Sequence, residues 1–99
     1  MPIKQNLSPG MPSDETLIAR VARRDTEAFE ILYDRHAAMV LGVCIQITRD
    51  HGMAESVLQE TFWQVWQSAI AYQNQNGSVT TWLFRIAREL AKGVTTTIE

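Results

Sequence analysis

Proline is confined to the first twelve residues of this chain of 99, at Pro2, Pro9 and Pro12. Proline breaks a helix because it lacks a backbone N–H and its ring clashes with the preceding turn. From Ser13 onward that obstacle is absent, and apolar residues recur at steps of three and four, the period of a helix buried on one side. No alternating run with a hairpin turn is present. The sequence therefore predicts an all-α fold.

Candidate capping residues divide this stretch into segments. A Ser or Asp side chain before a helix can accept hydrogen bonds from the free amides of the first turn. The candidates are Ser13 or Asp14, Asp25, Asp50 and Ser78. An apolar stripe follows each of them, and the polar segment 72–77 has the composition of a turn. We expect a compact bundle of about four helices, in which Gly42 permits close approach of a neighbouring helix.

The length suits a single domain. We expect residues 1–12 to form a flexible leader and residues 13–99 to form the domain. The leader has no apolar segment of a secretory signal, and the chain has no apolar run long enough to span a membrane. The one cysteine, Cys44, cannot form an internal disulfide, and its place in an apolar stripe is typical of a small buried residue. These features favour a cytoplasmic location without membrane insertion.

The net charge of −2 hides an uneven distribution. Residues 50–84 contain no Lys or Arg, and a basic segment follows them. Thr81, Arg85, Arg88 and Lys92 lie at steps of four, three and four, so on a helix they form one stripe about three turns long. Such a stripe is either a solvated helix face or a row of contacts to an anionic partner.

The helix expected after Asp50 has an acidic, amide-rich outer face, which includes Glu55, Gln59 and Glu60. Trp63 falls outside its apolar stripe, and an exposed aromatic residue is a plausible interface anchor. The alternative is a solvated polar face with Trp63 lying on its own helix. We expect Trp66 and Trp82 to belong to the core.

Enzymatic chemistry has no support in the sequence. His36 and His51 do not have metal-ligand spacing, and one Cys does not complete a zinc site. No Gly-rich phosphate loop and no nucleophile elbow is present. Glu55 and Glu60 are five residues apart and do not share a helix face closely. We therefore expect no catalytic residues, no metal and no cofactor, and we expect His36 to be a hydrogen-bonded core or boundary residue.

Three segments together resemble a known family. In order, they are residues 17–33, residues 54–66 and residues 81–88, and the resemblance covers about residues 14–92. These segments are similar to those of the extracytoplasmic-function (ECF) sigma factors, the small members of the sigma-70 family of bacterial transcription initiation factors. The resemblance implies a sigma region 2 domain.

In that family, region 2 docks on the clamp helices of the RNA polymerase β′ subunit and captures the non-template strand of the promoter −10 element as the duplex opens. The resemblance places polymerase contacts on the helix that carries the Gln-Glu-Thr-Phe motif, residues 59–62. The candidate polymerase-binding residues are Glu55, Ser56, Gln59, Glu60 and Trp63. The candidate DNA-binding residues are Asn74, Asn76, Ser78, Thr80, Thr81, Arg85, Arg88 and Lys92. Cations suit phosphates, and amides and hydroxyls suit the edges of an unstacked base. The family also implies an anti-sigma protein as a partner.

The chain departs from the family pattern at two positions. Ser56 stands where Asp is usual, and Glu89 stands where Asn is usual, which puts an acid on the helix expected to face DNA. The second domain of the family, a helix-turn-helix that reads the −35 element, has no counterpart in this sequence. An alternative function is therefore a sigma-like interaction module or decoy that binds an anti-sigma factor without binding DNA.

Overall fold

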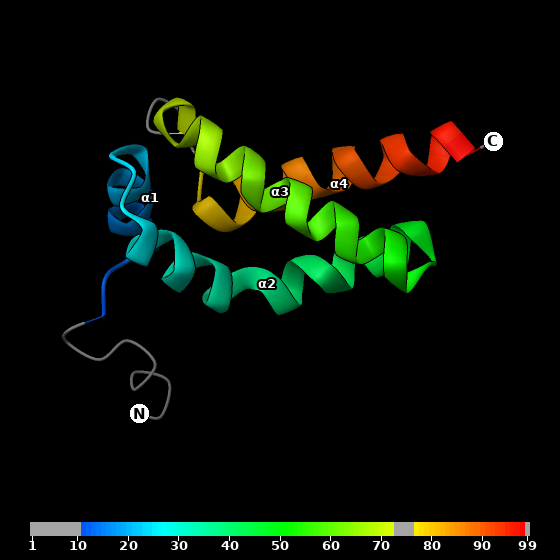
Figure 1. Cartoon of the computed structure of the whole chain (residues 1–99), viewed down its shortest axis with the longest axis horizontal. Helices are drawn as coiled ribbons and strands as arrows, with labels where there is room; N and C mark the ends of the chain where they lie inside the picture. The colour runs from blue at the N-terminus through cyan, green and yellow to red at the C-terminus, as the bar shows by residue number, and fades with distance from the viewer. Residues whose placement is uncertain (1–10, 73–76, 99) are drawn as a thin grey trace.

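The computed structural model describes residues 11–72 and 77–98, and for residues 96–98 it describes the backbone alone. It contains four helices, and the described residues form no strand, which confirms the all-α prediction (Figure 1). The helices are α1 (Asp14–Ala22), α2 (Thr26–Thr48), α3 (His51–Tyr72) and α4 (Val79–Ile98). The flexible leader predicted for residues 1–12 falls almost wholly outside the described residues.

Each helix begins at a capping residue that the sequence predicts. The side chains of Ser13, Asp25, Asp50 and Ser78 accept hydrogen bonds from amides two or three residues further on, at 2.9–3.2 Å. These bonds satisfy donors that have no partner inside the helix. Four local interactions therefore fix where the four helices start.

The joint between α1 and α2 has an unusual backbone. Helix α1 ends at Ala22, and Arg24 lies in the following turn with a positive φ of 67°. Its guanidinium lies 5.0 Å from the centroid of the Trp66 ring and donates a hydrogen bond to the Trp66 carbonyl oxygen. A positive φ is unfavourable for arginine. The contact of the Arg24 guanidinium with the Trp66 ring offsets part of that cost.

The core lies between α2, α3 and α4, which pack against one another in all three pairs, and α1 crosses the start of α2 and the end of α3 (Figure 1). Cys44 and Trp82 are buried as expected, and Trp66 is half-buried against Phe29. Burial raises the pKa of the Cys44 thiol. Thr61 is also buried, and its hydroxyl donates to the Val57 carbonyl oxygen one turn earlier.

Two expectations about single residues are wrong. Gly42 is exposed, and a Cβ added there would meet nothing within 4 Å, so no neighbouring helix approaches it. Tyr72 is not part of a polar loop. It is 7% exposed, its ring packs on Trp82, and its hydroxyl donates to the Gly77 carbonyl oxygen at 2.9 Å. Tyr72 thereby ties the end of α3 to the residue that leads into α4.

A polar cluster fastens α1 to α2. His36 is 7% exposed, and its Nε2 lies 2.9 Å from Asp14 Oδ2, as expected for a hydrogen-bonded boundary histidine. Arg35 Nη1 donates to the other carboxylate oxygen of Asp14 at 2.9 Å and to the Pro12 carbonyl oxygen at 3.0 Å. One carboxylate at the start of α1 thus contacts two neighbouring side chains of α2, whereas Arg35 Nη2 is buried without a hydrogen-bond partner among the described residues.

Candidate functional site

The outer face of α3 carries the five residues predicted to contact polymerase. Their side chains are all exposed, and they lie opposite the buried stripe of the same helix. They are Glu55, Ser56, Gln59, Glu60 and Trp63. Trp63 is 53% exposed, and Ile70, two turns further along, is 62% exposed on the same side of the helix. We call this surface the α3 outer face.

The charge on this face is negative and nearly unopposed. The sequence of α3 contains no Lys or Arg. Among the described residues, these five form one ion pair, which joins Glu55 Oε2 to His51 Nδ1 at 3.4 Å when the histidine is protonated, and both side chains are well exposed. Exposed apolar residues beside exposed acids are a combination suited to a partner that is both basic and apolar.

The four-residue motif at 59–62 has two roles. Gln59 and Glu60 are exposed, whereas Thr61 and Phe62 are buried. The Phe62 ring lies 4.9 Å from the Tyr33 ring, centroid to centroid, and therefore packs α3 on α2. The first two residues of the motif are thus available to a partner, and the last two belong to the core that positions α3.

The cationic side chains of α4 lie along one exposed line, as predicted. Arg85, Arg88 and Lys92 are all exposed, together with Thr81, on the side away from the buried residues of α4. Among the described residues, no carboxylate forms an ion pair with any of the three. We call this line the α4 ridge. Its charges are available to an anionic partner.

Glu89 lies at the edge of the α4 ridge. It is exposed, four residues after Arg85 and three before Lys92, and it forms no ion pair with a described residue. Its carboxylate therefore lowers the positive potential of the ridge without neutralising a specific cation.

The polar residues proposed to hold a base are only partly assembled. Ser78 and Thr81 form a cap pair in which the Ser78 hydroxyl donates to Thr81 Oγ1 at 3.0 Å and accepts from the Thr81 amide. Thr80 is half-buried. Asn74 and Asn76 lie outside the described residues. The structure therefore places the hydroxyls at the start of the α4 ridge and does not test the base pocket.

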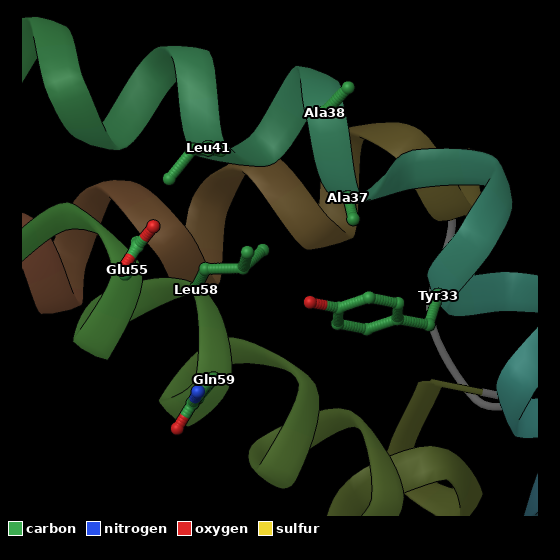
Figure 2. A pocket seen from close by; sticks show the side chains of 7 residues that line it. All are labelled: Tyr33, Ala37, Ala38, Leu41, Glu55, Leu58 and Gln59. Carbon is green, nitrogen blue, oxygen red and sulfur yellow. The ribbon is translucent and has the colours of Figure 1, made fainter. Parts of the chain in front are cut away.

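A groove between α2 and α3 is a feature that the sequence reasoning missed. It has a volume of about 430 Å³. Its lining residues are Tyr33, Ala37, Ala38, Leu41, Glu55, Leu58 and Gln59. Figure 2 shows the side chains of Tyr33 and Leu58 pointing toward each other, with Ala37 above the space between them. In the sequence, the adjacent small residues Ala37 and Ala38 indicate that a space could remain beside α2. Which residues of α3 face that space depends on how the two helices pack.

Metal binding has no candidate site in residues 11–72 and 77–95. No group of three or more His, Cys, Asp or Glu side chains in this part could hold a metal ion. No described helix is long and apolar enough to cross a membrane.

Comparison with known proteins gives a consistent result. Residues 32–92 match the sequence model of sigma-70 region 2. The ECF RNA polymerase sigma factor SigK of Mycobacterium sp. strain KMS is 39% identical over 77 residues, which is 78% of this chain and 40% of the relative. SigK of Mycobacterium bovis BCG is 34% identical over 84 residues, which is 84% of this chain and 45% of the relative.

The chain thus spans less than half the length of these curated relatives. No solved structure gave a significant match. The family match covers most of α2, all of α3 and most of α4, and it includes the α3 outer face and the α4 ridge. The chain belongs to the sigma-70 region 2 family.

Proposed function

We propose that this chain is the region 2 domain of an ECF-type sigma factor, which binds core RNA polymerase and recognises and melts the promoter −10 element. One observation carries the proposal: an acidic face with an exposed tryptophan lies on α3, and an exposed cationic ridge, with no ion pair to a described residue, lies on α4. Two surfaces of opposite charge on different helices fit one protein partner and one nucleic acid partner.

The α3 outer face is the proposed contact to the β′ clamp helices. Trp63 lies at the C-terminal end of the five exposed residues, one turn after Gln59 and Glu60, which flank it around the helix. A large aromatic side chain surrounded by polar groups is the usual composition of an interaction hot spot. Ser56 contributes a hydroxyl where family members usually have a carboxylate.

The α4 ridge is the proposed path of the non-template strand. Arg85 and Lys92 are separated by about 10 Å along the helix axis, since each residue adds about 1.5 Å. Three phosphate contacts on single-stranded DNA give a salt dependence of only about two in logarithmic slope, which is too weak for tight binding by the domain alone. The strand is therefore bound by the holoenzyme, and Glu89 weakens the ridge further.

The hydroxyls at the start of α4 are the proposed base contacts. Ser78, Thr80 and Thr81 stand where the helix meets segment 73–76, which supplies Asn74 and Asn76. These groups can donate to or accept from the edge of an unstacked base. An anti-sigma protein that covers the same surfaces is the proposed regulator, and the cytoplasm, where polymerase acts, is the proposed location.

The experiment measures binding of a fluorescent single strand that carries a −10 sequence. The expected result is strong binding to the domain mixed with core polymerase and weak binding to either component alone. The double variant Arg85→Ala/Arg88→Ala should reduce holoenzyme binding, with circular dichroism showing an unchanged helix content. Arg23→Ala, an exposed arginine on the α1–α2 joint, is the matched control and should bind as the wild type does.

A domain that associates with core polymerase but gives no strand binding would contradict the DNA half of this function. That outcome corresponds to the sigma-like interaction module. A folded domain that fails to associate with core polymerase would contradict the whole proposal.

A further inference from the structure

Glu89 is an exposed acid beside the row of cations on α4. It lies four residues after Arg85 and three before Lys92, so its carboxylate is on the side of the helix that carries the α4 ridge. Both spacings allow an ion pair on a helix, yet within the described part of the chain Glu89 forms none. The two carboxylate oxygens are therefore available as hydrogen-bond acceptors.

The backbone of a DNA strand gains nothing from this carboxylate. Phosphate and carboxylate are both negatively charged, and an ionised carboxylate has no proton to donate, so the two groups repel each other. A base carries no charge and presents N–H groups along its edges, which a carboxylate can accept. Along the helix axis, Glu89 lies about 6 Å beyond Arg85 and about 4.5 Å before Lys92. A strand held at both cations therefore passes Glu89 with a base within its reach.

The four bases differ in how many adjacent donors they offer. On the edge that pairs in a duplex, guanine presents N1–H and N2–H side by side, which match the two oxygens of one carboxylate. Adenine and cytosine each present an amino group next to an acceptor nitrogen. Thymine presents N3–H between two carbonyl oxygens, which repel a carboxylate. These edges are accessible only when the base is unpaired and unstacked, as in an opened promoter strand.

We propose that Glu89 is a specificity-determining residue, which accepts both donors of a guanine in the opened strand and so selects guanine over thymine at one position. The inference rests on the proposed function and deepens it, because it adds a base preference to a ridge that otherwise binds phosphates. The same carboxylate weakens the contact with the backbone and makes the contact with one base selective.

The test measures binding of fluorescent single strands to the wild-type holoenzyme, with each position of the −10 strand occupied in turn by each of the four bases. At the position that faces Glu89, guanine should bind about tenfold more tightly than thymine, the discrimination expected of one bidentate contact. Deoxyinosine, which lacks the N2 amino group but keeps N7 and O6, should lose most of this advantage. An arginine that read guanine through N7 and O6 would bind both equally well, and that result would overturn the proposal.

The variant Glu89→Gln changes the hydrogen-bonding pattern without changing the size of the side chain. Its amide donates one hydrogen bond and accepts one, the pattern that adenine presents at N7 and N6. The preference should therefore move from guanine to adenine, whereas affinity for core polymerase should stay within about twofold of wild type. The matched control is Glu30→Gln, the same change at an exposed acid of α2, which should keep the preference for guanine.

The outcomes separate this proposal from the proposed function. If Glu89→Gln strengthens binding to all four strands by the same factor, Glu89 acts through its charge alone. The specificity proposal is then overturned, and the proposed function stands. If the wild-type holoenzyme binds none of the strands, the DNA half of the proposed function fails and the specificity proposal fails with it.

Discussion

Asp25 illustrates how one side chain determines a local structure. Its carboxylate caps α2 and also accepts a hydrogen bond from Arg20 Nε at 2.9 Å. The hydrogen bond from Arg20, followed by those from the Ala28 and Glu27 amides, holds the pKa of Asp25 below its ordinary value of 3.8. The charged form of this side chain therefore stabilises the fold.

The sign of the pH dependence follows from this lowered pKa. A carboxylate with a lowered pKa in the folded state stabilises the protein above its unfolded pKa, and the contribution is lost as the pH falls through the folded value. We predict that Asp25→Asn lowers the free energy of unfolding at pH 7. The difference from wild type should shrink below about pH 3.8, as urea denaturation over a pH series would show. A difference that stays constant from neutral to acidic pH would contradict this assignment.

Two glycines should respond to alanine in opposite ways. Gly42 is an exposed residue inside α2 with nothing near its missing Cβ, so Gly42→Ala should stabilise the domain by about 1 kcal/mol. Gly77 has a φ of 109°, which alanine adopts only with strain, so Gly77→Ala should destabilise it by about 1 kcal/mol or more. Thermal unfolding of the two variants checks both signs, and equal shifts in the same direction would disprove the account.

At the scale of elements, the Asp14 carboxylate links α1 to α2. Asp14→Ala removes the carboxylate that contacts His36 and Arg35, whose side chains are mostly buried, and leaves Arg35 with its bond to the Pro12 carbonyl oxygen. Because a buried donor left without an acceptor is costly, we predict a loss of about 2 kcal/mol in the free energy of unfolding. Glu15→Ala, in the same turn but exposed, should change it by less than about 0.5 kcal/mol. Chemical denaturation compares them, and similar effects would show that the cluster does not hold α1.

The α4 ridge makes a second prediction at this scale. Each phosphate contact on a single strand contributes about 0.7 to the logarithmic salt slope, so Lys92→Ala should reduce the slope of holoenzyme binding by about that amount. The measurement is a titration of the −10 strand at several salt concentrations. Glu89→Gln removes a negative charge beside the ridge and should strengthen binding at low salt. An unchanged slope in Lys92→Ala would exclude that residue from the DNA contact.

The sequence predicted where the helices begin better than it predicted the contacts between them. The caps at Ser13, Asp25, Asp50 and Ser78 depend on residues two or three positions away, so local patterns suffice to find them. The bond between Asp14 and His36 joins residues 22 positions apart and depends on how two helices pack. The same holds for the groove at Ala37.

In the candidate site, too, features within one helix were predictable from the sequence, and features that depend on packing between helices were not. That Arg85, Arg88 and Lys92 lie on one face follows from helix periodicity alone, and so does the exposure of Glu60 and Trp63. The error at Tyr72 arose because the residues that follow it in sequence are polar, whereas its partners, Trp82 and Gly77, come from the far side of the joint. Patterns within one helix identify faces, and packing decides which side chains become core.

At the scale of the whole molecule, the account requires two independent surfaces on one small bundle. The aromatic contacts of Phe62 with Phe29 and Tyr33 fix α3 on α2, and Tyr72 with Trp82 connects α3 to the start of α4. A rigid core of this kind allows the α3 outer face and the α4 ridge to be altered separately. Changes on one surface should therefore leave binding at the other intact.

The most direct test compares two variants, Glu60→Lys on α3 and Arg85→Ala/Arg88→Ala on α4. The affinity of each variant is measured for core polymerase. The affinity of each resulting holoenzyme is then measured for the −10 single strand. We predict that Glu60→Lys lowers affinity for core polymerase by about tenfold or more, whereas the α4 variant keeps core affinity within about twofold and loses strand binding. If the α4 variant binds the strand as tightly as the wild type, or if both variants lose core binding equally, the assignment of one partner to each surface is contradicted.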